Sequence, residues 1–491
     1  MGLKQSLQTL LYVVRGDYLR ALAAANNKHS AWNTAWKLRA YYRLRMYAKA
    51  AGFYSSTHIQ KNILLEPLLV SLAACGRYED VQAALLRVDV HQLPLRLRCQ
   101  LSRRLAPFMP DVALQLLGGV EAAVPPTLWA SLLLKTGRHA QAEQVIAQAL
   151  DRGGLKRYPE LGLYQTMAQV TAPQEQLARL NAFLQVHGVP ALTLQDTATP
   201  PNPCNVAVAD ALPSMDGPLV TVLMTTFRTG ERASVAIQSL LNQTYRNLEI
   251  IVVDDASDDA TLAHVQAWAS RDARVRVLHL PANGGTYLAK SLGLQMARGE
   301  FVTCHDSDDW SHPLKIERQV RPLLEDASLV ATTSSWLRMR DDGVFYAWLV
   351  HPLMRFNPSS PLFRREQVLK RIGAWDLVRT GADSEFHARL KLVFGASAIK
   401  DIQQPLALGA HREGSLMTSG DTGYSAAGFS GTRLAYLEAW AQWHIECLRQ
   451  GKTPALPCDL REWAGYRPFA VPSEIAVPER AVQAALAVLS K

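Results

Sequence analysis

The sequence predicts an α/β domain built on a parallel sheet, with an all-α region before it and a helical extension after it. Strand and helix patterns alternate from about residue 218 to residue 335, and helices between strands in this way produce parallel sheets. Helical patterns fill residues 1 to about 185 and return from about residue 421. Ligands of such sheets bind beyond the carboxyl ends of the strands, so we expect functional residues there.

The elements of the α/β part follow a βαβα order. Apolar, β-rich runs predict strands at residues 219–226, 248–253 and 275–280. Helical patterns lie at residues 233–242, 259–270 and 286–297. Ser257 is placed to cap the second helix, and Gly299 follows the third.

Two acidic clusters fall at predicted strand ends. Asp254 and Asp255 follow the second strand, and Asp306, Asp308 and Asp309 follow an apolar run at residues 301–304. Crowded carboxylates repel one another unless a cation or hydrogen-bond donors offset them, so such clusters suggest a site. An acidic surface turn, or a favourable charge at a helix N-terminus, would explain each cluster taken alone.

A series of motifs in this part of the chain resembles the inverting family-2 glycosyltransferases of the GT-A fold. In order, the motifs are VLMTTF at 222–227, LNQTY at 241–245, IVVDDAS at 251–257, NGG at 283–285 and DSDD at 306–309. The resemblance covers roughly residues 218–415, and it rests on the order and spacing of the set. Arg228, where the family usually has Asn, and Lys290-Ser291, in place of Arg-Asn, depart from the family pattern.

The resemblance implies a nucleotide-diphospho-sugar transferase with a Rossmann-like GT-A fold and a UDP-sugar donor. Asp255 resembles the uracil-binding Asp of the family, with Thr225 and Phe227 lining the base pocket. Asp306 would lie on the sugar and ribose side, and Arg412 would pair with phosphate oxygens. The full set of expected donor contacts is Thr225, Phe227, Asp255, Lys290, Asp306 and Arg412.

A divalent cation is expected beside the donor. The departing diphosphate leaves as an anion, and a cation held by carboxylates stabilises that charge without a proton. Oxygen ligands favour Mg²⁺ or Mn²⁺ over zinc. The resemblance assigns Asp308 to the metal, and His411 could complete its shell, although a lone His is more often a surface or core residue.

The acceptor hydroxyl must lose a proton, so a general base is expected on the acceptor side. Asp383, at the head of a predicted amphipathic helix, resembles the family's acidic pair, whose first member is replaced here by Ala382. Glu385 could partly substitute for that member and contact the acceptor. Helix capping is the alternative role for Asp383. Trp310 could stack on a sugar face, with buried packing as its alternative.

The all-α region shows a weak repeat. Segments 78–85, 110–117 and 139–146 look like the second helices of helix pairs with a period near thirty residues, as in tetratricopeptide-type repeats. An irregular helical bundle is the alternative. The expected domains are a helical region at 1–185, a proline-containing linker at 186–217, a GT-A domain at 218–420 and a helical extension at 421–491.

Charge is concentrated near the beginning of the chain. Up to residue 65 there are ten Lys and Arg residues and the single acid Asp17, which amounts to the formal net charge of the whole chain, +9. Tyr and Trp residues lie among these charges. This mixture suits an anionic membrane surface or an anionic glycan; another protein is a further candidate, and a solvated basic face needs no partner. No nucleic-acid motif is present, so nucleic acid is not expected.

Composition fits an ordinary globular protein of two or three domains: 491 residues, 48% apolar and 19% charged. The six cysteines contain no Cys-x-x-Cys pair, which argues against a zinc site or a disulfide framework. No apolar stretch approaches the roughly 20 residues that span a bilayer, and no signal peptide is recognisable. We therefore expect a cytoplasmic protein, peripheral on the inner face of the cytoplasmic membrane.

Taken together, the motifs predict a metal-dependent, inverting hexosyl- or N-acetylhexosaminyltransferase. The resemblance implies a glycan or lipid-linked acceptor in bacterial surface polysaccharide synthesis, such as capsule. A contrasting hypothesis is a helical-repeat interaction protein whose transferase-like domain has lost turnover. Nucleotidyl transfer is disfavoured, because residues 225–230 do not form a Gly-rich basic phosphate loop.

Overall fold

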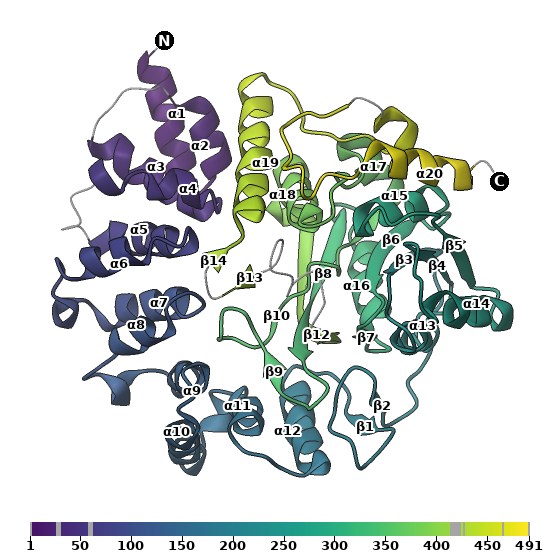
Figure 1. Cartoon of the computed structure of the whole chain (residues 1–491), viewed down its shortest axis with the longest axis horizontal. Coiled ribbons are helices and arrows are strands. Elements are labelled where there is room, and N and C mark those ends of the chain that lie inside the picture. The colour runs from purple at the N-terminus through teal and green to yellow at the C-terminus, as the bar shows by residue number, and fades with distance from the viewer. Residues whose placement is uncertain are drawn as a thin grey trace.

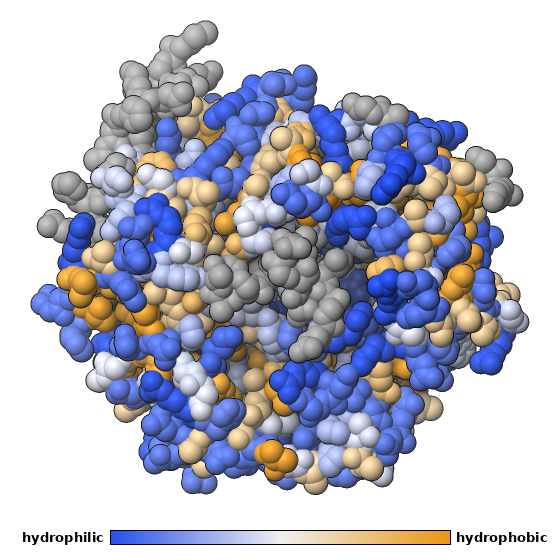
Figure 2. All heavy atoms as spheres, viewed as in Figure 1, coloured by the Kyte–Doolittle hydropathy of each residue, from blue (hydrophilic) through white to orange (hydrophobic). Residues whose placement is uncertain are grey.

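The computed structural model describes residues 2–25, 31–56, 62–412, 424–425, 428–463 and 466–489. Helices of the first part form an arc along one side of the molecule, and a mixed sheet with its covering helices forms the other side (Figure 1). Polar side chains dominate the face seen in Figure 2, with apolar side chains in small separate groups. The predicted architecture of a helical region followed by an α/β domain is confirmed.

The arc consists of short helices. Within the described residues these are α1 Gly2–Arg15, α2 Tyr18–Ala24, α3 Ala31–Arg43, α4 Tyr47–Ala51, α5 Asn62–Ala74, α6 Tyr78–Leu85, α7 Leu95–Leu105, α8 Pro110–Gln115, α9 Pro126–Lys135, α10 His139–Asp151, α11 Leu161–Ala168 and α12 Pro173–Val186. Single 3-10 turns join some of them: η1 Tyr54–Ser56, η2 Val90–Gln92, η3 Glu121–Ala123 and η4 Gly154–Lys156.

Three of these helices begin where the repeat pattern predicted second helices. They are α6, α8 and α10, and each packs against the helix before it. Gly76 and Gly137 precede α6 and α10 with φ of 72° and 73°, a left-handed turn that glycine adopts without strain. The region is therefore built from helix pairs, while its likeness to tetratricopeptide repeats stays a prediction.

The stretch expected to be a linker contains a packed hairpin. Strand β1, Leu192–Leu194, pairs antiparallel with β2, Val206–Val208. Leu192, Leu194 and Val206 are buried against α12 and neighbouring elements. The Asn205 amide donates to the carbonyls of Asp196, at 2.9 Å, and Thr199, at 2.8 Å, and so holds the hairpin loop.

A mixed sheet forms the centre of the α/β part. Its ten strands in the described chain are β3 Val220–Thr226, β4 Leu248–Asp254, β5 Val275–His279, β6 Phe301–Asp306, β7 Trp310–Ser311, β8 Ala331–Met339, β9 Phe345–Tyr346, β10 Arg355–Phe356, β11 Leu362–Arg364 and β12 Ile399–Ala410. The order is β5-β4-β3-β6-β11-β8-β12-β7, with β9 and β10 also paired to β8. Strands β5, β4, β3 and β6 are parallel, and β11 runs antiparallel to β6.

Helices cover both faces of the parallel strands, which explains why these strands are apolar throughout. The helices are α13 Arg232–Leu241, α14 Thr261–Arg271, α15 Thr286–Gln295, α16 Lys315–Glu325, α17 Arg365–Ile372 and α18 Ala382–Phe394, followed by η5 Ala396–Ala398. Leu223 and Ile251 pack on the α15 side, whereas their neighbours Val222 and Ile250 pack on the α13 side. Successive side chains of a strand point to opposite faces, so both faces require apolar residues.

Register brings the strand ends together. Thr226 lies opposite Asp254, and Thr225 lies opposite Asp306. The two acidic clusters, about fifty residues apart in the sequence, therefore reach the same edge of the sheet, as predicted from the parallel arrangement.

One local prediction was wrong: Ser257 does not cap the helix that follows it. Helix α14 begins at Thr261, whose N–H donates to the Asp259 carboxylate at 3.0 Å. Ala256 has a positive φ of 63°, and the turn brings the Ser257 hydroxyl to the N–H of Arg228 instead, at 3.0 Å. Ser257 therefore ties together the two loops that follow β3 and β4.

In the last part of the chain, one helix packs between the arc and the α/β part, and another packs on α15 (Figure 1). This part comprises β13 Tyr424–Ser425, β14 Gly428–Phe429, α19 Gly431–Arg449, η6 Leu460–Trp463 and α20 Glu479–Leu489. Trp440 and Trp443 of α19 belong to the same buried cluster as Leu22 of α2. The Glu438 carboxylate accepts the N–H groups of Ala48 and Lys49 at 2.7 and 3.1 Å. Helix α19 thus joins the arc to the α/β part (Figure 1).

Candidate active site

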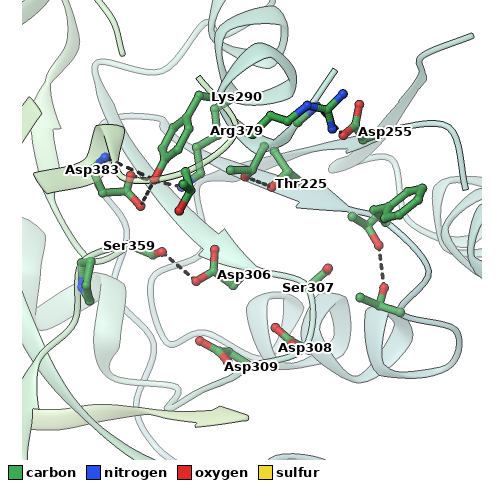
Figure 3. Close-up of a pocket in the computed structure, with 18 of the residues that line it drawn as sticks. Thr225, Asp255, Lys290, Asp306, Ser307, Asp308, Asp309, Ser359, Arg379 and Asp383 are labelled. Carbon is green, nitrogen blue, oxygen red and sulfur yellow. Dashed lines mark hydrogen bonds and ion pairs between the residues drawn. The ribbon is translucent and has the colours of Figure 1, made fainter. Parts of the chain in front are cut away.

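A cavity of about 500 Å³ opens at the carboxyl ends of β3, β4 and β6. Residues from the β3, β4 and β6 ends, the start of α15, strand β8 and the start of α18 line it. Figure 3 shows Asp255 and Asp383 on opposite sides of the cavity, with Asp306, Ser307 and Asp308 below them in that view. The cavity therefore collects residues that are more than a hundred positions apart in the sequence.

Asp254 and Asp255 have different roles in the structure. Asp254 is fully buried, and its Oδ2 accepts the N–H of Ser257 and contacts Nδ1 of His279, at 3.1 and 2.8 Å. Asp255 lines the cavity, and its two oxygens accept the N–H groups of Gly284 and Gly285 at 2.7 and 2.8 Å. Burial raises the pKa of Asp255 to about 6, although these hydrogen bonds act in the opposite direction.

The NGG motif is explained by this contact. Gly285 has a φ of 88°, a conformation that other residues rarely adopt, and a Cβ at Gly284 would collide with the Leu288 side chain. Glycine at both positions lets two consecutive N–H groups reach Asp255. Arg379 donates to the side chain and the carbonyl of Asn283, at 2.8 and 3.1 Å, and lies close enough to Asp255 to lower its pKa.

Thr225 and Phe227 lie at the end of β3, and both line the cavity. The Thr225 hydroxyl shares a hydrogen bond of 2.7 Å with that of Thr286. The Phe227 side chain is 38% exposed, and the Arg228 guanidinium lies 5.0 Å from its ring centroid. Arg228 has a positive φ of 50°, a conformation that Asn adopts more readily than most other residues.

The three carboxylates at the end of β6 all line the cavity, and Asp309 is the most deeply buried of them. Asp306 and Asp308 line the cavity: Asp306 accepts the Ser359 hydroxyl at 2.7 Å, and Asp308 accepts Nε of Arg412 at 2.8 Å. Asp309 is 5% exposed and accepts the N–H of Ala410 at 2.9 Å. Burial, together with the neighbouring carboxylates, raises the pKa of Asp309. Asp309 therefore ties the acidic loop to β12.

The cavity supplies only some of the ligands that a divalent cation needs. Among the residues that the structure describes, no group of three or more His, Cys, Asp or Glu side chains is placed to hold a metal ion. Asp306 and Asp308 nevertheless bring two carboxylates to the cavity. Mg²⁺-type ions are commonly held by one or two carboxylates together with substrate phosphates. The residues therefore fit a cation bound together with a diphosphate, and not a cation held by protein ligands alone.

Asp383 belongs to the cavity and is held by two side chains of α15. Its Oδ2 accepts the Tyr287 hydroxyl at 2.9 Å, and its Oδ1 lies 3.3 Å from Nζ of Lys290. The Asp383 side chain is 18% exposed, whereas Lys290 is almost completely buried. Burial raises the pKa of Asp383, and the charge of Lys290 opposes that effect. The carboxylate thus points to α15 instead of capping its own helix (Figure 3).

Lys290, expected among the donor contacts, lines the cavity but pairs with Asp383. Burial alone would lower the pKa of Lys290, but the charge of the Asp383 carboxylate raises it well above the usual value. The ammonium therefore stays charged. Its observed contact is with the candidate base.

Glu385 does not reach the cavity, which corrects the expectation of an acceptor contact. Its side chain is completely buried between α18 and α19, where it accepts Nε and Nη2 of Arg389, each at 2.8 Å, and Nε2 of His444 at 2.9 Å. It lies two residues after Asp383 on a helix, and positions two apart point to different sides. Glu385 is a structural residue.

Two further expected contacts also lie away from the main cavity. Trp310 is 6% exposed and packs in a core cluster with Leu408 and Leu337, so the packing alternative holds for this residue. His411 stacks on Tyr346 with 3.5 Å between ring centroids, and burial lowers its pKa to about 4. Neither residue lines the cavity. The remainder of the closing loop, residues 413–415, lies outside the described residues.

Other cavity residues were not recognised from the sequence. They include the large side chains Tyr287, Trp336, Arg338, Arg379 and Arg433. The guanidinium of Arg338 lies 5.3 Å from the Trp336 ring centroid, and Arg433 donates from Nη2 to the Thr380 hydroxyl at 2.9 Å. Tyr287 could have been found, because it lies one turn before Lys290 on the same face of a predicted helix. Trp336 and Arg338 come from β8, Arg379 from the segment before α18, and Arg433 from α19. Only the tertiary fold brings these segments to the site.

Comparison with known proteins agrees with this geometry. Residues 221–383 match the family described as Glycosyl transferase family 2. The glycosyltransferase GlyG of Streptococcus pneumoniae serotype 4 is 35% identical over 131 residues, which are 27% of this chain and 44% of that protein. TuaG of Bacillus subtilis strain 168, named for teichuronic acid biosynthesis, is 31% identical over 134 residues, 27% of this chain and 53% of that protein. The chain thus matches about half of the length of these relatives, or less.

Among solved structures, Staphylococcus aureus TarS 1–349 in complex with UDP-GlcNAc is similar with a TM-score of 0.33 and 21% identity, over 40% of this chain and 59% of TarS 1–349. The family match, the sheet order and the strand-end carboxylates together define the class: the chain contains a family 2 glycosyltransferase domain with a GT-A-like fold, preceded by a region of many helices. No helix in the described ranges has the length and apolar character that a membrane crossing requires.

Proposed function

We propose that the protein is a metal-dependent, inverting glycosyltransferase that moves a sugar from a UDP-sugar to a glycan or lipid-linked acceptor. One observation carries the proposal. The carboxylates of Asp255, Asp306, Asp308 and Asp383, from three segments of the chain, all line one cavity. In this proposal Asp255 binds the base of the donor. Asp306 and Asp308 serve the rest of the donor and its cation, and Asp383 serves the acceptor.

Asp383 is proposed as the general base. It would accept the proton of the acceptor hydroxyl as that oxygen attacks the anomeric carbon from the face opposite the diphosphate, and this single displacement inverts the configuration. Burial raises the pKa of Asp383, which makes the carboxylate a better proton acceptor near neutral pH. Tyr287 and Lys290 contact both of its oxygens and hold the orientation of the carboxylate.

The donor would bind along the ends of β3 and β4. We assign the base to the pocket of Thr225, Phe227 and Asp255, where an N–H of a uracil ring can donate to the carboxylate. Asp255 is compatible with this role because its other hydrogen bonds come from backbone N–H groups, which hold it in place. Asp306 would contact the sugar or ribose.

Asp308, with Asp306 beside it, would hold Mn²⁺ or Mg²⁺ together with the diphosphate of the donor. When bound, the cation supplies positive charge that stabilises the departing diphosphate. Arg412, which contacts Asp308 at 2.8 Å, would add a further positive charge near the phosphates.

The acceptor is assigned to a bacterial surface polysaccharide pathway, at the inner face of the cytoplasmic membrane. The name of the relative TuaG refers to teichuronic acid biosynthesis, which supports this assignment. Trp336 lines the cavity from β8 and presents an aromatic ring on which a sugar could stack. We assign to Trp336 the sugar-stacking role that the sequence analysis considered for Trp310.

Calorimetry with UDP tests the proposal. We expect Mn²⁺-dependent binding of UDP to the wild type and its loss in Asp308→Ala. Asp341→Ala is the matched control, because Asp341 also pairs with an arginine, Arg232, but does not line the cavity. If UDP fails to bind the wild type with or without Mn²⁺, the UDP-sugar assignment is wrong, and an interaction protein with an inactive transferase-like domain becomes the better hypothesis.

A further inference from the structure

Helix α1 has two different faces. On one face Thr9 is 5% exposed, and Tyr12 and Val13 pack against the largest core cluster. On the other face four large apolar side chains are exposed to solvent: Leu7 59%, Leu10 42%, Leu11 46% and Val14 76%. We call these four residues the α1 stripe. Their spacing of three, four and seven positions places them along one side of the helix.

The α1 stripe is unusual within this molecule. Thirteen large hydrophobic residues are strongly exposed in the described chain, and four of them belong to this helix of 14 residues. The others, such as Leu86, Leu155 and Val170, lie apart from one another in the sequence. Single exposed apolar residues are normal in proteins, whereas a continuous stripe marks a surface that binds another apolar phase.

The charges around the α1 stripe are positive. Within α1 the charged residues are Lys4 and Arg15, with no acid. Asp17 follows, and its carboxylate is already occupied: it caps α2 by accepting the N–H of Arg20 at 3.2 Å and pairs with that guanidinium at 2.6 Å. An apolar stripe beside basic residues is complementary to a surface of anionic headgroups over acyl chains.

The length of α1 determines how this helix can bind a lipid surface. Fourteen residues are too few to cross a bilayer, for which about 20 apolar residues are needed. A helix with one apolar and one packed face lies in the plane of the interface instead. Helix α1 packs on α2, and α2 packs on α19, whose residue Arg433 lines the cavity. A surface bound at α1 would therefore be connected to the cavity through packed helices.

We propose that the α1 stripe seats the protein on an anionic lipid bilayer, with α1 lying in the headgroup region. The observations favour a lipid surface over a protein partner because apolar and basic groups occur together while the acid of this region is occupied. This proposal does not depend on glycosyl transfer, so a failure of the UDP experiment leaves it standing.

Co-sedimentation of the full chain with vesicles tests the proposal. We expect binding to vesicles that contain phosphatidylglycerol, little binding to pure phosphatidylcholine, and weaker binding at high salt. Leu11→Glu should lower the affinity for the anionic vesicles by about tenfold or more, because it puts a charge into the stripe. Leu86→Glu is the matched control, since Leu86 is 89% exposed on a different helix pair, and it should bind as the wild type does.

A second measurement distinguishes loss of lipid binding from misfolding of the variant. In Leu11→Trp the indole emission should shift to shorter wavelength when anionic vesicles are added, because the ring enters an apolar environment. The proposal is overturned if the wild type does not sediment with anionic vesicles, if Leu86→Glu weakens binding as much as Leu11→Glu, or if the Trp emission does not move. Self-association without lipid that Leu11→Glu abolishes would also overturn it, in favour of a second copy of the chain as the partner.

Discussion

Asp383 receives its properties from two neighbours on α15 that are more than ninety positions away in the sequence. Tyr287 donates to one of its oxygens and Lys290 contacts the other, at 2.9 and 3.3 Å. If Asp383 is the base, its removal should affect the proton transfer and leave donor binding intact. We predict that Asp383→Asn lowers kcat by about 10²–10⁴-fold with an unchanged Kd for UDP in calorimetry. Loss of UDP binding in this variant would place Asp383 on the donor side instead.

Lys290 should set the pH dependence of the same step. The titratable groups that face Asp383 are Tyr287 and Lys290 from α15 and Cys304 and Asp306 from β6. The base acts in its ionised form, so the rate falls as the pH drops below its pKa. Lys290 lowers that pKa, and its removal must raise it.

We therefore predict that Lys290→Met moves the acidic limb of the kcat/KM profile to higher pH, while Lys290→Arg keeps it near the wild-type position. Profiles measured with a saturating metal ion would check this. An unshifted limb in Lys290→Met, with a raised KM for the donor, would return Lys290 to the donor contacts.

At the scale of elements, α18 is fixed to α19 by a buried polar network. Glu385 of α18 binds Arg389 on its own helix and His444 on α19, and Arg389 also donates to the carbonyls of Ile372 and Ala374. All three charged or titratable side chains are completely buried. This network holds the helix whose first turn carries Asp383, so α19 belongs to the active-site scaffold.

Breaking this network should be costly because it leaves a buried charge without its partner. We predict that Glu385→Ala lowers the free energy of unfolding by about 3–5 kcal/mol. Glu175→Ala is the matched control: Glu175 also pairs with an arginine four residues later, Arg179, but its side chain is 52% exposed. That change should cost less than about 1 kcal/mol. Urea denaturation of both variants gives the comparison, and equal losses would contradict the structural role of Glu385.

The same network predicts that the folded protein becomes less stable at acid pH. Burial alone would raise the pKa of Glu385, but the charge of Arg389 and the hydrogen bond from His444 lower it to about 2, against an ordinary value of 4.5. The unfolded chain therefore binds the proton more readily than the folded one. The stability that this group contributes is complete above pH 4.5 and is lost as the pH falls towards 2. Denaturation curves of the wild type and Glu385→Gln should converge over this interval; a constant difference would contradict the prediction.

At the scale of the whole molecule, the arc of helices and the α/β part share one hydrophobic core. Leu22 of α2, Trp440 of α19 and Leu288 of α15 belong to a single buried cluster. Helix α19 contacts both α2 and α18. Because the cluster crosses the boundary between the two parts, we expect them to unfold together and not as independent domains.

Leu22→Ala tests this coupling. Leu22 is 3% exposed, and removal of a buried leucine side chain costs about 2–5 kcal/mol. We predict that the substitution shifts one cooperative transition, seen equally by circular dichroism and by loss of UDP binding, whereas Leu86→Ala leaves it in place. An early transition confined to the N-terminal helices, with UDP binding retained, would contradict the shared core.

Much of the α/β part was predictable because its signals are local. The strands before Asp254 and Asp306 are apolar runs, and the parallel arrangement alone requires that their carboxyl ends meet. Three of the predicted second helices begin where the repeat pattern placed them. Ser257 was mispredicted because a positive φ at Ala256 turns its hydroxyl to another loop. An alanine in the sequence does not predict a positive φ.

The sequence by itself determined the fold class, the strand-end position of the site and the cavity residues Asp255, Asp306, Asp308 and Asp383, since these depend on short motifs and on strand order. Only the tertiary structure decided the partners of those residues. In the folded chain Glu385 is buried against α19, and Lys290 is paired with Asp383. Trp336 of β8 lines the cavity, whereas Trp310 and His411 do not. The physical reason is that burial and charge pairing depend on segments distant in the chain, which a local pattern of residues does not specify.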